Sequence, residues 1–427
     1  MVSYAEASVV PPEPLPLGGY TARGKSLFSP GGDDLKVRCL TLKKGDTTIA
    51  LVNLEQLTVP KSLYQWVRSR IPATTSLWMG ATHTHCAPDS QMLNSSMVFE
   101  VPGIAKFDRV WLDWYGNRIT ACIQEALAGL EKKPVRVQDG SVHVSTLFEN
   151  RGRRRLATPI RTLTQWRGGD LPLWTTYGAH ATIFGEDRLA LSGDWPGRAM
   201  QMGGGLVFPG AIGDISPIGQ GPTLEARVQD LAERVNHVGP EFLRIKTEDQ
   251  LRFASAPIDL GPPVPHPTFA QVNKVTPGLA AMAVRAFTPT KAEIAAVRWG
   301  GSVMVGVPGE PSADLGRRIE LDGRNLGFKH VVVVSHVNDW IGYILMPDDY
   351  DRGGYEATLC FHGREAATRV RQAALAAMMN LARRRSDGGS ARRLEWQSSQ
   401  TGLRAHPNRP HANSAALPHS VAGFSFR

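Results

Sequence analysis

The sequence of 427 residues has only four cysteines, Cys39, Cys86, Cys122 and Cys360. They form no C-x-x-C pair, and four thiols are too few for a disulfide scaffold in a chain of this length. We therefore expect all four to be reduced. Cys86 directly follows a histidine, and we expect it to be a small buried residue rather than a metal ligand.

Long apolar runs are also absent. No stretch approaches the roughly 18 uninterrupted apolar residues that indicate a membrane-spanning helix. The first six residues, Met-Val-Ser-Tyr-Ala-Glu, have neither the basic region nor the apolar region of a signal peptide. Apolar residues nevertheless make up 42% of the chain, enough for a sizeable core. These features predict a soluble protein, with the cytoplasm slightly favoured over secretion.

The chain has fewer acidic than basic residues. Its 39 Asp and Glu and 48 Lys and Arg give a net charge of +9. After Leu381 the chain has eight arginines and two acids, so this end accounts for +6 and the remainder only for +3. The second basic cluster, Arg151 to Arg155, has no interleaved aromatic residues. We expect no nucleic-acid partner, whereas the basic end would allow peripheral contact with an anionic membrane.

Short β-branched runs alternate with longer helical patterns, which favours an α/β fold. We expect one domain over residues 1–385 and a basic, disordered tail over residues 386–427, where Gly, Ser, Arg and Pro occur without periodicity. The predicted strands are Thr48–Asn53, Leu77–Ala81, Leu173–Tyr177, Ser302–Val307 and His330–Ser335. The predicted helices are Ser62–Arg70, Phe107–Glu131, Leu224–Val235, Ser312–Leu321 and Glu356–Arg385.

One segment matches the sequence pattern of a nucleotide-binding loop, but the residues around it do not suit that structure. Residues 19–26, Gly-Tyr-Thr-Ala-Arg-Gly-Lys-Ser, fit the phosphate-loop pattern G-x-x-x-x-G-K-S. That loop requires a buried strand before it and a helix after it. Four prolines between residues 11 and 16 exclude a central strand, and Ser-Pro-Gly-Gly at 29–32 ends any helix. We predict a glycine-rich turn that enters the domain.

Two histidines follow the predicted strand Leu77–Ala81, in the sequence Thr82-His83-Thr84-His85. Alternate residues of an extended chain point to the same side, so His83 and His85 would project from one face. Two imidazoles in this arrangement suit a divalent metal, above all zinc. The pair alone is weak evidence, because paired histidines are also common on protein surfaces.

Three more metal-competent side chains come shortly after predicted strands, namely His180, Glu310 and Tyr343. Strand ends of an α/β sheet can converge on one edge, where such folds place their sites. Each residue also has a structural explanation. His180 could be a hydrogen-bonded core histidine, Glu310 an acid at a helix N-terminus, and Tyr343 a packed aromatic. Their shared position after strands favours a joint site.

These motifs, taken in order, resemble the catalytic domain of the neutral ceramidases, non-lysosomal zinc amidases that cleave N-acylsphingosine. The resemblance covers about residues 8–375 and implies a layered α/β domain with mixed β-sheets flanked by α-helices. Its motifs are Pro-Leu-Gly-Gly-Tyr (16–20), Ala-Thr-His-Thr-His (81–85), Asn-Arg (150–151), Gly-Ala-His (178–180), Ser-Gly-Asp (192–194), Gly-Asp-Ile-Ser-Pro (213–217), Pro-Gly-Glu-Pro (308–311), and Tyr343 with Tyr355.

The resemblance implies a function and a set of roles. The chain would be a zinc-dependent hydrolase that cleaves the amide bond of an N-acylated substrate, first of all ceramide or a related N-acyl lipid, in sphingolipid metabolism. The Zn²⁺ ligands would be His83, His180, Glu310 and Tyr343. The residues around the substrate carbonyl would be His85, Arg151 and Tyr355. Ser216 falls on the serine described as the family's nucleophile, with a zinc-bound water as the rival.

The sequence departs from the family in places that bear on the substrate. The segment after His85 reads Cys-Ala-Pro-Asp where the family is rich in serine and glycine, and Pro217 is followed by Ile-Gly-Gln. The resemblance therefore supports zinc-dependent amide hydrolysis more strongly than it supports ceramide as the substrate. Two alternatives stay open: a noncatalytic homologue that binds lipid or a membrane surface, and a serine esterase that uses Ser216. The chain has no G-x-S-x-G motif, and Ser216 could also be a turn or capping serine.

Overall fold

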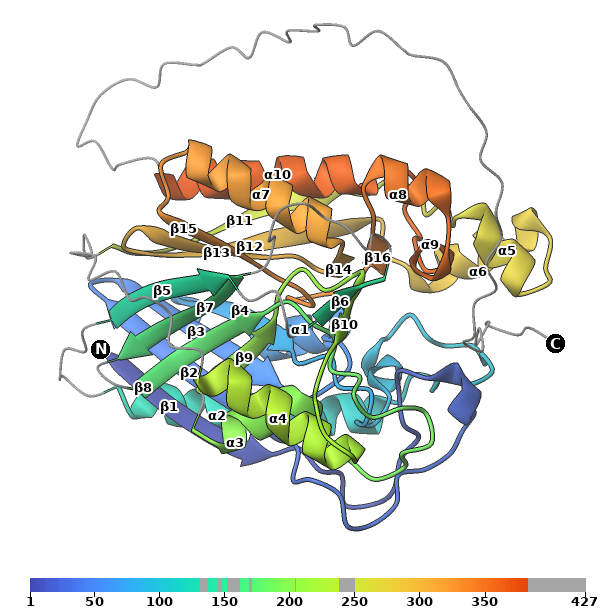
Figure 1. The fold of residues 1–427 in the computed structure, drawn as a ribbon, viewed down its shortest axis with the longest axis horizontal. Helices are drawn as coiled ribbons and strands as arrows, with labels where there is room; N and C mark the ends of the chain where they lie inside the picture. Colours follow the sequence, from blue (N-terminus) through green and yellow to red (C-terminus); the bar gives the residue numbers. More distant parts are fainter. Residues whose placement is uncertain are drawn as a thin grey trace, which may run out of the picture.

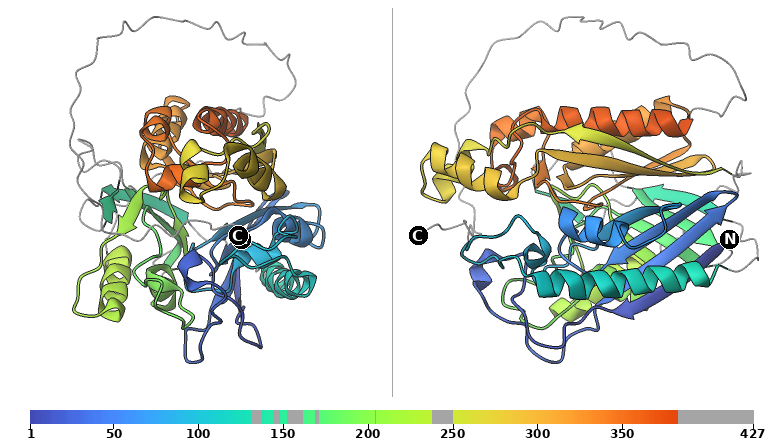
Figure 2. Two further views of the ribbon diagram at one scale, coloured as in Figure 1. Left: turned by 90° about the vertical axis from the view of Figure 1, so that its right-hand side faces the viewer. Right: turned by 180° about the vertical axis from the view of Figure 1, so that it is seen from behind.

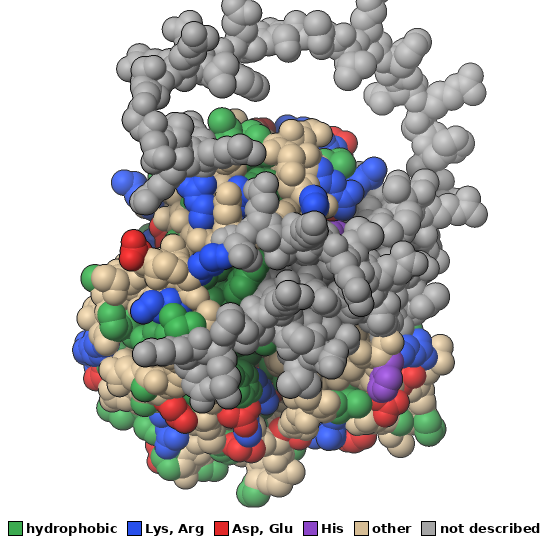
Figure 3. Space-filling model, turned by 90° about the vertical axis from the view of Figure 1, so that its left-hand side faces the viewer, with side chains coloured by type: hydrophobic (Ala, Val, Ile, Leu, Met, Phe, Trp, Pro, Cys, Tyr) green, Lys and Arg blue, Asp and Glu red, His purple; other side chains and the backbone are tan. Residues whose placement is uncertain are grey.

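The computed structural model describes residues 1–130, 137–143, 148–151, 162–168, 171–203, 205–237 and 250–382. The cluster residues Arg153 to Arg155 and the predicted tail from residue 386 lie outside these ranges. No helix within them is long and apolar enough to cross a membrane. On the face drawn in Figure 3, acidic and basic side chains are interspersed over the described surface.

The N-terminal part of the chain forms a four-stranded sheet covered by two helices. Its strands lie in the order β1-β2-β3-β4, with β1/β2 and β2/β3 antiparallel and β3/β4 parallel. Helix α1 connects the two parallel strands, and α2 follows β4. The elements are β1 (Val2–Ser8), β2 (Lys36–Lys44), β3 (Thr47–Leu54), α1 (Lys61–Arg68), β4 (Thr75–Ala81) and α2 (Arg109–Ala128).

Two further sheets repeat this connectivity, each with two antiparallel pairings and then a parallel one joined through a helix. The second unit consists of β5 (Val137–His143), β7 (Thr162–Gly168), β8 (Leu171–Tyr177), α3 (Asp194–Gln201), β9 (Leu206–Pro209) and α4 (Leu224–His237). The third consists of β11 (Leu251–Asp259), β12 (Lys291–Trp299), β13 (Ser302–Gly306), α7 (Ala313–Asn325), β15 (His330–Val334) and α10 (Ala366–Ala382).

Smaller elements occur along the chain between the main strands and helices of the three units. They are the 3-10 helices η1 (Thr21–Arg23) and η2 (Ser90–Leu93), the strand pairs β6 (Phe148–Asn150) with β10 (Ile215–Pro217) and β14 (Glu310–Pro311) with β16 (Tyr343–Ile344), and the helices α5 (Pro267–Val272), α6 (Pro277–Phe287), α8 (Pro347–Arg352) and α9 (Tyr355–Thr358). Both strand pairs join segments that are far apart in the sequence. They therefore fix the loops that follow the main strands.

The three units surround a common core, as the end-on view in Figure 2 shows. The inner faces of the sheets contribute the apolar side chains of Leu51 and Trp78, Trp174 and Phe208, and Val297 and Val332. The outer faces are covered by α1 and α2, by α3 and α4, and by α7 and α10 (Figure 1). Because both faces of β3 are buried, this strand is almost continuously apolar instead of alternating.

The structure confirms the predicted layered α/β class with mixed sheets, and each of the five predicted strands and the first four predicted helices has a counterpart. The single helix predicted over Glu356–Arg385 is wrong. The described residues form two helices there, α9 and α10, separated at 359–365. The intervening backbone pairs Cys360 with Gly342 and His362 with Val264, and these tertiary pairings replace helical hydrogen bonds.

The segment that matches the phosphate-loop pattern is a turn, as predicted. It contains the three-residue helix η1, and the residues before it make only isolated bridges, from Pro16 to Leu27 and from Leu17 to Pro88. No strand of the described chain leads into it, so the requirement for a phosphate loop is not met.

Candidate metal centre

Three side chains from three different units converge at one end of the common core. His83 follows β4, His180 follows β8, and Glu310 follows β13. All three are buried, and their ligand atoms lie within 4.8 Å of one another. The Oε2 atom of Glu310 is 3.3 Å from Nε2 of His180 and 3.6 Å from Nε2 of His83. Two imidazoles and a carboxylate at these distances are a donor set that zinc binds.

Each of these ligand atoms is oriented by a second contact. The Nδ1 atom of His83 lies 2.8 Å from the carbonyl oxygen of Leu57, and Nδ1 of His180 lies 2.7 Å from that of Ile215. When Nδ1 carries the proton and donates it, Nε2 presents its lone pair to the centre. The indole Nε1–H of Trp340 donates to Oε1 of Glu310 at 3.0 Å, which leaves Oε2 for the metal.

The protonation states suit a cation. Burial lowers the pKa of His180 to about 4, so its imidazole is neutral near pH 7. Burial alone would raise the pKa of Glu310, but His83 and His180 outweigh it and hold this pKa well below its usual range. A neutral imidazole at His180 and an ionised carboxylate at Glu310 are therefore available together.

Tyr343 completes the predicted ligand set. It pairs directly with Glu310 in the parallel β14–β16 register, and this pairing brings the two side chains to the same centre. Its hydroxyl lies 3.5 Å from Nε2 of His180. Burial raises the pKa of Tyr343 well above its usual value, so the phenol keeps its proton unless a cation is nearby. A dication favours the phenolate, and the four residues thus fit a zinc ion.

The three residues expected around a substrate carbonyl lie beside this centre. The Nε2 atoms of His85 and His83 are 3.3 Å apart, and burial lowers the pKa of His85 well below its usual value. The Tyr355 ring centroid is 6.2 Å from that of Tyr343, and burial raises the pKa of Tyr355 to about 12. Arg151 donates to the Gly213 carbonyl at 2.6 Å and forms an ion pair with Glu356 at 2.7 Å. At neutral pH, His85 is neutral and Tyr355 keeps its proton.

Ser216 lies in β10, directly after Ile215, whose carbonyl faces His180. It pairs with Glu149 of β6. Among the described residues its hydroxyl has no hydrogen-bond partner, and no histidine holds it as a base would. Ser216 is therefore the next residue after one that contacts His180. It lacks the hydrogen bond that a serine nucleophile makes with its histidine base.

Two site residues were not singled out from the sequence. The His336 ring stacks on that of His83 with the centroids 4.0 Å apart, and neither of its nitrogens has a hydrogen-bond partner in the part of the chain that is described. Trp340 contacts Glu310 as described above. His336 comes two residues after the end of β15, so the rule of strand-end residues that indicated the other histidines would also have found it. Nothing in the sequence signals the Trp340 contact.

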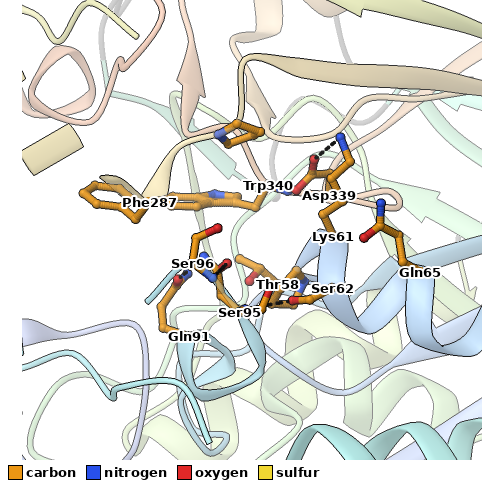
Figure 4. Close-up of a pocket in the computed structure, with 13 residues that line it drawn as sticks. Thr58, Lys61, Ser62, Gln65, Gln91, Ser95, Ser96, Phe287, Asp339 and Trp340 are labelled. Atoms are coloured by element: carbon orange, nitrogen blue, oxygen red, sulfur yellow. Dashed lines mark hydrogen bonds and ion pairs between the residues drawn. The ribbon is translucent and has the colours of Figure 1, made fainter. Parts of the chain in front are cut away.

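A small polar cavity of about 160 Å³ has Trp340 among its lining residues (Figure 4). Thr58, Ser62 and Phe287 are among its lining residues, whereas none of the four predicted ligands is. Two of its hydroxyls are engaged internally, because Thr58 bonds to Ser90 at 2.7 Å and Ser62 donates to the Leu93 carbonyl at 2.5 Å. The cavity is thus separate from the metal centre.

Comparisons with known proteins were made for sequence and for structure. No family model matches the chain, and no curated protein matches it. Among solved structures, a neutral ceramidase from Pseudomonas aeruginosa superimposes with a TM-score of 0.74 at 16% identity, over 89% of this chain and 74% of the other. A ceramidase complexed with C2 superimposes equally well, over 75% of its own chain.

These similarities cover most of the chain. They agree with the resemblance of the ordered motifs. The chain therefore has the fold of the neutral ceramidases.

Proposed function

We propose that this protein is a zinc-dependent hydrolase that cleaves the amide bond of an N-acylated substrate. The observation that carries the proposal is the convergence of His83, His180 and Glu310, one from each structural unit, with Tyr343 beside them. Zinc held there would polarise a carbonyl oxygen and lower the pKa of water from about 15.7 to about 7. This is the chemistry that amide hydrolysis requires.

The surrounding side chains can stabilise the charge that develops on the carbonyl oxygen. In our proposal, His85 in its neutral form donates from Nε2, Tyr355 donates its phenolic hydrogen, and Arg151 contributes positive charge. Loss of one such donor typically costs about 2.7–4 kcal/mol of transition-state stabilisation. The attacking group is a water molecule or the Ser216 hydroxyl, and a Ser216→Ala variant separates the two, since only the second requires the side chain.

Ceramide or a related N-acyl lipid is the first choice of substrate. Its support is the ordered set of motifs together with the fold shared with two ceramidase structures. Short Cys-Ala-Pro-Asp and Ile-Gly-Gln segments differ from the family near His85 and Ser216. The substrate is therefore best identified by a panel of N-acyl amides that varies in both acyl length and amine.

The test combines metal analysis with mass-spectrometric detection of amide cleavage, before and after chelation. We expect one zinc per chain, hydrolysis of at least one N-acyl lipid, loss of activity on chelation and recovery with zinc. His83→Ala and Glu310→Ala should lose both zinc and activity. His237→Ala, which changes an exposed histidine of α4, is the matched control and should keep both. Activity retained in metal-free protein would overturn the proposal.

These measurements, together with vesicle binding and inhibitor labelling, distinguish the two alternatives. A noncatalytic lipid-binding homologue predicts stoichiometric zinc, no hydrolysis across the panel, and salt-sensitive binding to vesicles that contain anionic lipid. A serine esterase predicts that a serine-directed inhibitor labels Ser216 and that chelators leave activity intact.

A further inference from the structure

The turn formed by residues 18–24, within the phosphate-loop-like segment, packs against His85. We propose that this turn is a positioning element that holds the His85 imidazole beside the metal centre. The inference rests on the proposed function, in which His85 donates to the substrate. It assigns a role to Gly19, Tyr20 and Arg23, none of which is a predicted ligand or contacts His83, His180 or Glu310 among the described residues.

The first contact is the close approach of the backbone to the His85 ring. Gly19 has a φ of +90°, and a Cβ atom added there would lie 2.5 Å from both Cγ and Nδ1 of His85. Any side chain larger than hydrogen would therefore displace the imidazole. A second wall is the Tyr20 ring, whose centroid is 4.7 Å from that of His85 and whose hydroxyl donates to the Phe184 carbonyl at 3.1 Å.

Arg23 fixes the turn to the segment that carries His85. Its side chain is only 7% exposed, which is unusual for arginine. The guanidinium donates to the carbonyl oxygens of His85 and Gly18, and also to those of Gly185 at 2.9 Å and Glu186 at 2.8 Å. One side chain thereby joins three separate segments of the chain. Lysine keeps the charge but lacks the planar fork that reaches several carbonyls at once.

His85 depends on this packing more than the two liganding histidines do. Nδ1 of His83 faces the Leu57 carbonyl, and Nδ1 of His180 faces the Ile215 carbonyl. Nδ1 of His85 is buried and has no hydrogen-bond partner within the described residues. Apart from the approach of its Nε2 to Nε2 of His83 at 3.3 Å, its ring is held by Gly19 and Tyr20, and its backbone by Arg23.

The test measures kcat, KM and zinc content of wild type and variants on an N-acyl lipid that the wild type hydrolyses. We expect Gly19→Ala, Tyr20→Leu and Arg23→Lys each to lower kcat roughly 10- to 100-fold, the effect of a misplaced donor, with zinc still stoichiometric and KM within about threefold. Tyr20→Phe keeps the ring and should retain most of the activity. Lys25→Ala is the matched control, since Lys25 lies in the same motif and its one ion pair among the described residues is with the exposed Glu100.

Other outcomes would overturn the inference in recognisable ways. If Tyr20→Leu and Arg23→Lys keep kcat within twofold, the turn does not position His85. If they lose zinc and kcat in parallel, its role is general stability. An effect of Lys25→Ala as large as that of Arg23→Lys would show that the loss does not depend on the contacts with His85, and would contradict the inference. A wild type that binds zinc but hydrolyses no amide overturns the proposed function itself, and with it this inference.

Discussion

Hydrogen bonds from outside the candidate metal site determine where its side chains point. Trp340 donates to the Glu310 oxygen that faces away from the centre, at 3.0 Å. We expect Trp340→Phe, which keeps an aromatic ring but removes the N–H donor, to weaken zinc binding about 10- to 100-fold, as loss of an outer-shell partner usually does. Competition titration against a zinc-binding dye measures this directly.

A control for this substitution lies across the polar cavity. Phe287 lines the same cavity and packs on Phe361, without a contact to Glu310 among the described residues. Phe287→Leu should therefore leave zinc affinity within about threefold of wild type. Equal losses in the two variants would mean that packing, rather than the indole N–H, orients Glu310.

The residues of the candidate metal site could be predicted from the sequence because each one follows an apolar run at a strand end. His83, His180 and Glu310 share this local signal, although they are far apart in the chain. Their mutual distances could not be predicted, since they depend on how three sheets meet. The Trp340 contact depends further on a loop in which His336 and Asn338 both have positive φ, and no residue pattern specifies that path.

At the scale of elements, the residues of the candidate site come shortly after a parallel strand in each unit. β4 ends at Ala81, two residues before His83, and it packs tightly against β9 of the second unit. A Cβ atom added at Gly80 would lie 2.7 Å from the Phe208 ring. Only hydrogen at Gly80 therefore allows the two sheets to approach this closely.

We expect Gly80→Ala to destabilise the protein by about 1–3 kcal/mol, the usual cost of overpacking a core. Denaturant unfolding followed by circular dichroism measures the change. A second substitution, Phe208→Leu, should recover part of the loss, because it removes the ring that the new methyl meets. Gly278→Ala in α6, where an added Cβ meets nothing within 4 Å, is the control and should be neutral or slightly stabilising. Additive losses in the double variant would contradict the proposed clash.

Whether a segment forms a helix or a strand could be predicted from the sequence better than where the element ends, and better than the repetition of one connectivity in the three units. The predicted helix over Glu356–Arg385 failed because its alanine-rich periodicity is a local signal, whereas the break at 359–365 arises from pairing of Cys360 with Gly342. The three-fold repetition of connectivity was also invisible in the sequence. Each unit keeps the same strand order with unrelated side chains, so only the backbone hydrogen bonds reveal it.

At the scale of the whole molecule, the metal centre joins the three units, because each supplies one of the three clustered ligands. Zinc should therefore stabilise the native state as a whole, by about 2.7 kcal/mol when free zinc is 100 times its dissociation constant. We expect chelation to lower the melting temperature of the complete chain, and zinc to restore it. Glu310→Gln should melt at the same temperature with and without zinc. A zinc-dependent shift in that variant would indicate binding elsewhere.

The predicted boundary near residue 385 can be tested by truncation. Helix α10 buries Met378 and Leu381 completely, and the carbonyl of Leu381 accepts hydrogen bonds from Arg252 at 3.0 Å and Arg298 at 2.9 Å. A chain ending at residue 385 keeps all of these contacts, so we expect its melting temperature, zinc content and activity to equal those of the full chain. A chain ending at residue 374 removes both apolar side chains, at about 1.5–3 kcal/mol each, and should unfold. Reduced activity with unchanged melting in the chain that ends at residue 385 would assign residues 386–427 a role in activity rather than in folding.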